Sequence, residues 1–221
     1  MKKINIAIDG PGGAGKSSIS KAIAKELGFI HVDTGAMYRA IGLYAIRNNC
    51  TEPEQLARQI EKIDIELKFI GGVQRVLLCG DDVSDYIRSP EVSMAASKVS
   101  AVPEVRKHLL DLQKKIAAEN NIIMDGRDIG TVVLPHADLK IFLTASAEER
   151  ASRRYLELRE KPDCPSYEEI LADMKQRDYQ DTHRAIAPLC QAEDAVVVDS
   201  SDMGFHEVVE HITNLIKEKL D

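Results

Sequence analysis

Short apolar runs alternate along most of the chain with longer stretches in which apolar residues recur at helical spacing. The apolar runs are residues 4–8, 29–32, 122–124, 139–143 and 195–198. Short, continuously apolar runs between helical stretches are typical of a parallel sheet that helices cover on both faces. The pattern therefore predicts an α/β fold built on five parallel strands, the first of which ends at Asp9.

Several helix boundaries are marked by residues that favour them. A helix is predicted over 16–27, and Gly28 follows it, where a left-handed conformation closes a helix easily. Another is predicted near 36–48. Pro103 favours the first turn of a third helix that runs to about Glu119. The last helix carries an apolar stripe that we expect to pack in the core, made of Phe205, Val208, Val209, Ile212, Leu215 and Ile216.

One stretch of the chain breaks this alternation. Residues 63–69 alternate apolar and polar with period two, the glycines at 71–72 predict a turn, and 73–78 predict a returning strand. A third strand is predicted within 82–87. Strict alternation is typical of antiparallel strands with one solvated face, so we expect a small meander inserted into the parallel layout.

Composition and length narrow the class of protein. The chain has 221 residues, 44% of them hydrophobic and 29% charged. A chain of this length removes about 70% of its unfolded surface from water, so it needs no disulfide or metal to fold. The four cysteines and six histidines lack the spacing of a metal site, and we expect reduced thiols. We therefore predict a single domain over 1–221.

The net charge of −7 argues against a nucleic-acid or membrane footprint over the whole surface. The basic start is followed by too few apolar residues for a signal peptide, and no run of about 18 apolar residues occurs. We expect a cytoplasmic monomer without a nucleic-acid or membrane partner. Positive charge is nevertheless concentrated in one helical region, interrupted around Pro162 and Pro165, at Arg150, Arg153, Arg154, Arg159, Lys161, Lys175, Arg177 and Arg184. These cations either face an anion or pair with glutamates on a solvated helix surface.

Residues 10–17 match the phosphate-loop pattern G-x-x-x-x-G-K-[ST] in full, between a predicted buried strand and a predicted helix. Glycines let the backbone curl so that consecutive N–H groups point at phosphate oxygens, and the helix start adds its positive end. Lys16 is expected to reach the β- and γ-phosphates of ATP, and Ser17 to ligate Mg²⁺. The predicted nucleotide-binding residues are Gly10, Pro11, Gly12, Gly13, Ala14, Gly15, Lys16, Ser17 and Ser18.

The remaining motifs favour a small kinase among phosphate-loop proteins. The Asn-Lys-x-Asp tetrad of GTPases is missing from the sequence, and motor and transport ATPases usually need longer chains. Polar turns follow the second and third predicted strands at 33–39 and 125–128. Because open α/β sheets bind ligands at the carboxyl ends of their strands, both turns should face the phosphate loop.

With these motifs in place, the chain resembles bacterial cytidylate kinases, a branch of the nucleoside monophosphate kinases. The resemblance extends over nearly the whole chain. Its motifs are the phosphate loop from Asp9, Asp33-Thr-Gly-Ala-Met-Tyr-Arg39, Ala95-Ala-Ser97, Val105-Arg106, Asp125-Gly-Arg-Asp-Ile-Gly-Thr-Val-Val133 and Arg184-Ala-Ile-Ala-Pro-Leu189. Some members have serine where this chain has Thr34, which keeps the hydroxyl.

The resemblance implies transfer of the γ-phosphoryl group of ATP to CMP or dCMP. It also implies a five-stranded core with a monophosphate-binding insertion at about 62–100 and a helical lid at about 150–166. The substrate-binding residues that it implies are Thr34, Tyr38, Arg39, Ser97, Arg106, Arg127, Asp128, Arg177, Asp181 and Arg184. Catalytic roles are expected for Lys16, Arg127 and Arg184, and a metal-binding role for Ser17 and Asp125, with Asp33 as a second metal candidate and helix caps as the alternative for both acids.

The chemistry of the bases supports these assignments. Cytosine offers an amine donor at N4, which a carboxylate accepts, and uracil turns a carbonyl to the same place. Asp128, with Arg106 and Ser97 as donors, meets this demand. The alternative for Asp128 is a helix cap or an ion pair with Arg127.

A second group of candidates comes from spacing alone. Arg177, Asp181 and Arg184 share one face if a helix persists, where they either hold ribose and phosphate or form an intrahelical ladder of ion pairs. Arg39 and Arg127 follow strand ends and are the better candidates for the acceptor phosphate. Other readings are a kinase for shikimate or another small acceptor, and a nucleotide-binding regulatory module without turnover.

Overall fold

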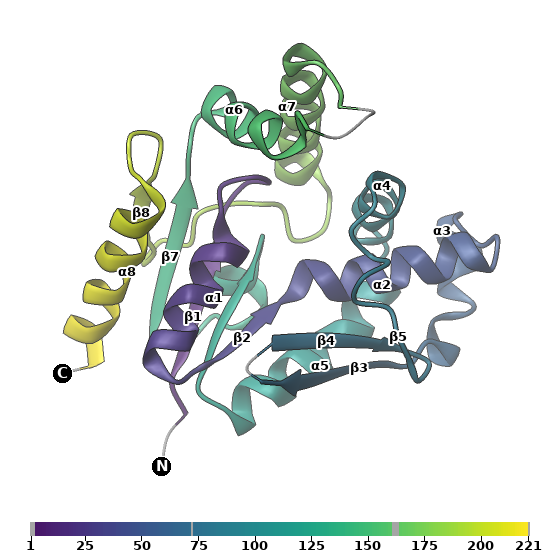
Figure 1. Ribbon diagram of the computed structural model, residues 1–221. Helices are drawn as coiled ribbons and strands as arrows, with labels where there is room; N and C mark the ends of the chain where they lie inside the picture. Colours follow the sequence, from purple (N-terminus) through teal and green to yellow (C-terminus); the bar gives the residue numbers. More distant parts are fainter. Residues whose placement is uncertain (1–2, 72, 161–163, 221) are drawn as a thin grey trace.

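The computed structural model describes residues 3–71, 73–160 and 164–220. Its main sheet has five parallel strands in the order β2-β6-β1-β7-β8 (Figure 1). The strands are β1 (Asn5–Asp9), β2 (Ile30–Asp33), β6 (Ile122–Gly126), β7 (Leu139–Thr144) and β8 (Val196–Asp199). The five predicted parallel strands are confirmed, each to within one or two residues at either end.

Helices cover both faces of this sheet because neighbouring side chains of a strand point to opposite sides. In β1, Ile6 and Ile8 pack with α1 (Lys16–Leu27) and α8 (Phe205–Leu220). Ala7, between them, packs with α2 (Thr34–Arg47) and α5 (Pro103–Glu119) on the other face. The strands β1 and β6 and most of β7 are buried as a result, which accounts for their apolar runs, whereas Val196 and Val197 of the edge strand β8 are exposed.

The helix boundaries agree with the residues that mark them, except at the start of α2. Gly28 ends α1 with φ 70°, and Pro103 opens α5. The helix α2 begins at Thr34, before the predicted start near Ala36, because the Asp33 side chain accepts a hydrogen bond from the Ala36 N–H at 3.0 Å and caps it. Phe205 is 47% exposed, so its predicted place in the core is wrong.

The predicted meander forms a separate antiparallel sheet of β3 (Ile65–Ile70), β4 (Val73–Leu78) and β5 (Asp81–Asp82). The third strand shares only Asp82 with the predicted range 82–87, because the chain turns after that residue. The Ser84 hydroxyl there accepts a hydrogen bond from the Val76 N–H at 2.8 Å. The buried side of this sheet belongs to the same apolar cluster as α2 and α5, so the inserted segment shares its core with the main sheet.

Three short helical segments, α3 (Pro53–Ala57), η1 (Ile60–Lys62) and α4 (Pro90–Val99), flank the small sheet. The helices α2 and α4 approach closely at Gly42, where an added Cβ would lie 2.9 Å from the backbone nitrogen of Ala96. This contact holds Ser97 and Ser100, at the end of α4, against the side of the molecule that carries the strand ends.

The cation-rich region forms two helices, α6 (Ala147–Leu158) and α7 (Tyr167–His183), beyond the carboxyl ends of the strands (Figure 1). The break between them falls where it is predicted, although Lys161 and Pro162 lie outside the described residues. Pro165 directly precedes Ser166, whose side chain and Glu169 form a reciprocal cap at the start of α7. Among the described residues, no helix is both long enough and apolar enough to cross a membrane.

Candidate active site

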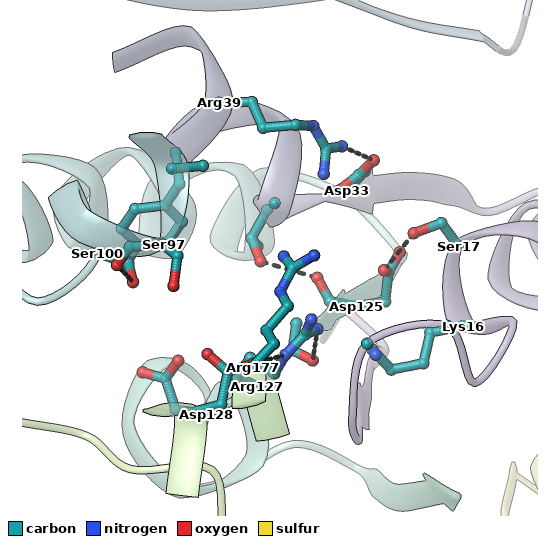
Figure 2. Close-up of a pocket in the computed structure, with 18 of the residues that line it drawn as sticks. Lys16, Ser17, Asp33, Arg39, Ser97, Ser100, Asp125, Arg127, Asp128 and Arg177 are labelled. Atoms are coloured by element: carbon teal, nitrogen blue, oxygen red, sulfur yellow. Dashed lines mark hydrogen bonds and ion pairs between the residues drawn. The ribbon is translucent and has the colours of Figure 1, made fainter. Parts of the chain in front are cut away.

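A cavity of about 390 Å³ opens at the carboxyl ends of β1, β2 and β6. The parallel pairing of β2 with β6 places Asp33 level with Asp125 at this edge. The predicted turns at 33–39 and 125–128 both face the phosphate loop, as expected (Figure 2). The predicted site residues line the cavity with the exception of Gly10, Pro11, Ala14 and Arg106.

The backbone of the phosphate loop requires glycine at two positions in particular. Gly15, which precedes α1, has φ 85°, in the left-handed region. At Gly10, with φ 148°, an added Cβ would lie 1.9 Å from the carbonyl oxygen of Leu143. The loop therefore presses against the end of β7, and its curvature is set by packing as well as by sequence.

Lys16 lies at the floor of this loop. Its Nζ donates hydrogen bonds to the carbonyl oxygens of Gly10 at 2.8 Å and of Pro11 at 2.6 Å. Burial, and after it the nearby Arg127 guanidinium, lowers the pKa of the Lys16 amine well below its ordinary value. An anion placed in the loop would favour the charged amine, so phosphate binding and lysine charge support each other.

Ser17 and Asp125 form the oxygen pair expected of a Mg²⁺ site. The Ser17 hydroxyl donates to Asp125 Oδ2 at 2.7 Å, and His31 Nε2 lies 2.6 Å from Asp125 Oδ1. Burial acts to raise the pKa of the Asp125 carboxyl, but the contacts with His31 and Ser17 outweigh it and hold the pKa below its ordinary value. Asp33, by contrast, caps α2 and pairs with Arg39 at 3.0 Å, so the cap interpretation is correct for Asp33.

Asp128 is buried between two arginines at the other end of the cavity. Arg106, stacked beside the Tyr38 ring, contacts Asp128 Oδ2, and the Arg184 guanidinium lies 3.2 Å from Asp128 Oδ1. Burial raises the pKa of the Asp128 carboxyl, and both arginines act against this rise. The two alternatives for Asp128 are wrong: its side chain makes no capping hydrogen bond, and its ion pairs are with Arg106 and Arg184, not with Arg127.

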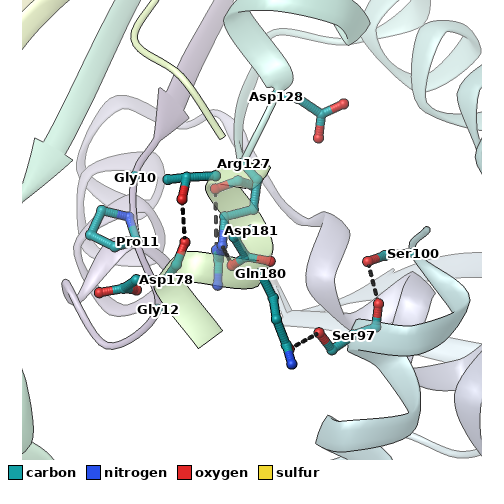
Figure 3. Close-up of polar contacts among 12 residues, drawn as sticks. Gly10, Pro11, Gly12, Ser97, Ser100, Arg127, Asp128, Asp178, Gln180 and Asp181 are labelled. Atoms are coloured by element: carbon teal, nitrogen blue, oxygen red, sulfur yellow. Dashed lines mark hydrogen bonds and ion pairs between the residues drawn. The ribbon is translucent and has the colours of Figure 1, made fainter. Parts of the chain in front are cut away.

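The two serines of α4 occupy different places. The Ser97 hydroxyl lies 3.5 Å from Gln180 Oε1, on the rim of the cavity (Figure 3). Ser100, one turn later, contacts both arginines of the Asp128 cluster: its carbonyl accepts from Arg106 at 3.2 Å, and its hydroxyl lies 3.5 Å from Arg184.

The residues Arg177, Asp181 and Arg184 line the cavity together, as predicted, although α7 ends at His183 and Arg184 follows in an extended conformation. The alternative of an intrahelical ladder is wrong. Asp181 Oδ2 accepts from Arg127 Nε at 2.8 Å, and Arg184 pairs with Asp128, so both contacts cross to the loop after β6.

Two guanidinium nitrogens at this site are buried without a hydrogen-bond partner. They are the Nε atoms of Arg39 and Arg177. Burial and the neighbouring Arg127 lower the pKa of Arg177 below its ordinary value. A buried N–H without an acceptor is unfavourable. Arg39 and Arg177 line this cavity together with Lys16 and Arg127. An anionic ligand with several oxygens would accept hydrogen bonds from their unpaired N–H groups and balance the positive charge.

Thr34 and Tyr38 support the walls of the cavity. The Thr34 hydroxyl donates to the backbone carbonyl of Asp125 at 2.8 Å, and burial raises the pKa of Tyr38 to about 12. Both side chains also face the cavity. They connect α2 to the loop after β6, which carries Arg127 and Asp128.

The cations of α6 have three different environments. Arg150 is buried and donates to the carbonyl of Gly12 at 2.8 Å and to both carboxylate oxygens of Asp178. Arg153 pairs with Glu149 one turn away and also donates to the carbonyl of the buried Ser200 at 2.6 Å and to its hydroxyl at 3.2 Å, so it joins α6 to the segment after β8. Arg154 lines the cavity and pairs with Glu157 at 2.9 Å.

Comparison of this chain with known proteins identifies its family. A model of the family described as cytidylate kinase matches residues 6–218. The chain belongs to the cytidylate kinase family. It is 55% identical to a cytidylate kinase of Caldicellulosiruptor saccharolyticus over 97% of this chain and 96% of the relative. It is 50% identical to a cytidylate kinase of Desulfitobacterium hafniense over 100% and 95%.

The resemblance to cytidylate kinases is therefore confirmed. A crystal structure of an uncharacterized protein from Eubacterium ventriosum is similar in fold, with a TM-score of 0.53 at 14% identity over 98% of this chain and 99% of that one.

In this member of the cytidylate kinase family, three contacts were not predicted from the sequence. His31, one of the six histidines whose spacing does not indicate a metal site, contacts Asp125. Ser100 contacts the Asp128 cluster, and Arg150 contacts the phosphate loop. In the parallel pairing of β2 with β6, His31 is level with Ile123, so its contact with Asp125 depends on the register between the two strands. Arg150 belongs to the cation-rich region that the sequence indicates, but its contact with the phosphate loop carried no local signal, and neither did the contacts of Ser100.

Proposed function

We propose that this member of the cytidylate kinase family transfers the γ-phosphoryl group of ATP to CMP or dCMP, forming ADP and CDP or dCDP. The observation that carries the proposal is the arrangement of charge along one cavity. A glycine cradle with Lys16 lies at one end, a carboxylate held by two arginines lies at the other, and cations lie between them. Two nucleotides whose phosphates meet in the middle match this order of charges.

On the donor side, the backbone N–H groups of residues 12–18 and the Lys16 amine would hold the phosphates of ATP, with Gly10 and Pro11 shaping the start of the loop. The Ser17 hydroxyl and the Asp125 carboxylate, 2.7 Å apart, are the hard oxygen donors that Mg²⁺ prefers, and the low pKa of Asp125 keeps it charged. When bound, Mg²⁺ would neutralise charge on the β- and γ-phosphates. His31 would keep the Asp125 carboxylate oriented.

On the acceptor side, Arg39, Arg127 and Arg177 would bind the monophosphate. Their positive charge, part of it on buried N–H groups without partners, supports this role. A phosphate oxygen of CMP attacks the γ-phosphorus, and the bond from that phosphorus to the bridging β-oxygen breaks as ADP leaves. The attacking oxygen is already anionic, so alignment and charge neutralisation by Lys16 and the arginines carry the reaction.

The base would lie against the cluster of Asp128, Arg106 and Arg184. Asp128 would accept the N4 amine of cytosine, and Ser97 on the rim would contact the base from the side of α4. Asp181, which pairs with Arg127, would bind the ribose, with Thr34 and Tyr38 as the supporting wall. Because a mismatched buried polar group is penalised strongly, such a site would favour cytosine over uracil.

Within the same proposal, the single domain 1–221 contains a monophosphate-binding insertion at about 62–100 and a lid at about 150–166, of which residues 161–163 lie outside the described part. The acidic balance of the surface supports a cytoplasmic monomer that has no nucleic-acid or membrane partner.

Closure of the lid would exclude water from the reacting phosphates. Arg154 is the α6 cation that lines the cavity, and its exposed pair with Glu157 is weak enough to exchange for a phosphate. With fluorotyrosine incorporated, we expect the ¹⁹F resonances of Tyr155 and Tyr167 to shift when ADP and CMP are added together. Tyr44 on α2 is the control. Unchanged Tyr155 and Tyr167 resonances at saturation would contradict a moving lid.

The reaction itself is tested by an ADP-coupled assay that offers ATP with CMP, dCMP, UMP, AMP or shikimate in separate reactions. We expect CMP and dCMP to support turnover, and UMP and AMP to support far less. Turnover with shikimate alone would assign the site to another small acceptor. ADP release that does not depend on any acceptor would point to a nucleotide-binding module rather than a kinase.

A further inference from the structure

Asp9 is a buried carboxylate that the proposed reaction does not use. It ends β1, is 5% exposed, and directly precedes the phosphate loop that begins at the next residue. Each of its oxygens accepts one backbone N–H across the sheet: Oδ1 from Ile129 at 2.8 Å and Oδ2 from Gly130 at 2.7 Å. The contact joins segments that are 120 positions apart in the sequence.

The two N–H groups belong to the start of an irregular helical turn, Ile129–Val133, that directly follows Asp128. The first N–H groups of any helix have no partner within it and are usually satisfied by the side chain of the preceding residue. Asp128 occupies that capping position but makes no capping hydrogen bond. Asp9 satisfies the turn from a different strand, and this leaves the Asp128 carboxylate available to Arg106 and Arg184.

The backbone of Asp9 belongs to the donor side of the site. Its neighbour Gly10 supplies a carbonyl that accepts from Lys16. We propose that Asp9 is a positioning residue that holds the Asp128 loop in register with the phosphate loop, so that base recognition and phosphate binding share one rigid reference. This inference rests on the proposed function.

The charge surroundings of Asp9 support a functional reason for keeping it. Lys16 faces it from α1, Asp128 from the loop after β6, and the stem of Lys140 from β7, where an added Cβ on Gly130 would lie 3.1 Å from Lys140 Cδ and 3.3 Å from Asp9 Oδ2. Burial raises the pKa of Asp9 to about 6, and the two N–H groups act against this rise.

The raised pKa means that folding disfavours the charged form of Asp9. Its contribution to stability is therefore greatest below its ordinary pKa of 3.8 and is lost as the pH rises through about 6. At neutral pH the buried charge opposes folding. Asp9 therefore destabilises the fold at neutral pH, yet it caps the loop that carries Asp128. Residues that destabilise a fold are expected where function requires them.

The test is the Asp9→Asn variant, because an amide can accept one of the two N–H groups but not both. We expect KM for CMP to rise about tenfold, the effect of one unsatisfied buried donor, while the Kd for ATP measured without acceptor changes less than about twofold. The matched control is Asp138→Asn, which alters the carboxylate that accepts the Asn5 N–H at 2.9 Å near the opposite end of β1. Equal changes in both constants, or a change in neither, would overturn the proposal.

A second measurement uses the wild-type protein without nucleotide. The amide ¹H–¹⁵N resonances of Ile129 and Gly130 should titrate with a midpoint near pH 6, and the Asp9→Asn variant, if it folds, should lose this titration. Resonances that stay constant through this range would refute the link even if the variant does not fold. A wild-type protein that fails to phosphorylate CMP would refute the proposed function, whereas the ligand-free titration still tests the contact of Asp9.

Discussion

Replacing Lys16 with alanine is expected to lower kcat for CMP by about 10²–10³-fold, the usual loss when one group that stabilises developing charge is removed. The Lys16 amine is the cation at the floor of the phosphate loop, held there by two backbone carbonyls. Arg150 contacts the Gly12 carbonyl and Arg127 lies near the Lys16 amine, but these arginines are held in ion pairs with Asp178 and Asp181, so neither is expected to replace the amine. The measurement is steady-state turnover with saturating ATP and CMP.

The Lys16→Ala variant should remain folded. Folding lowers the pKa of this lysine through burial, so the charged amine opposes folding, and this unfavourable contribution grows as the pH falls below the lysine's ordinary pKa. Its removal should leave the midpoint of thermal unfolding at pH 7 unchanged or higher. Lys21→Ala, at an exposed position on the same helix, is the control and should retain normal kcat. A Lys16→Ala protein that is folded and turns over normally would contradict the assigned role.

Replacing Asp128 with asparagine is expected to lower the ratio of kcat/KM for CMP to that for UMP by about 10–100-fold. A carboxylate accepts the N4 amine of cytosine and rejects the O4 carbonyl of uracil. An asparagine side chain can turn its NH₂ toward that carbonyl, so it accommodates both bases. The measurement is kcat/KM for each nucleotide at one ATP concentration.

Asp181→Asn provides the matched control for this prediction. Asp181 is also buried, lines the same cavity and pairs with an arginine, but it lies on the side of Arg127 rather than with the base-reading cluster. We expect this variant to lower kcat/KM for CMP and for UMP to a similar degree, so that the ratio of the two values stays unchanged. An unchanged ratio in Asp128→Asn, or an equal change in both variants, would show that Asp128 does not select the base.

Much of the fold could be predicted from the sequence because its signals are local. The central strands β1 and β6 are mostly apolar since both their faces are covered, and this pattern is visible within five or six residues. Gly28 and Pro103 mark helix ends through their own backbone preferences. Phe205 shows the limit of such reasoning: the apolar stripe of α8 continues to its first residue, yet the tertiary structure leaves this side chain 47% exposed.

The candidate site divides in the same way. The phosphate-loop motif is continuous in the sequence, so its place between β1 and α1 and the left-handed glycine before α1 follow from its residue types and order. The partners of Asp128 are not continuous: Arg106 comes from α5 and Arg184 from the end of α7, and spacing alone suggested that Arg184 shares a helix face with Asp181. The alignment of strand ends, and not any local pattern, decides which of these charges meet.

Residue pattern alone was enough for the α/β class, the five strands, the inserted meander and a loop that cradles phosphate, because each of these depends on neighbours within one segment. The tertiary structure decided which buried charge faces which, as in the contact of His31 with Asp125 and the capping of Ile129 by Asp9. Such contacts follow from the register between distant strands. Register is set by the packing of the whole core, which no single segment contains.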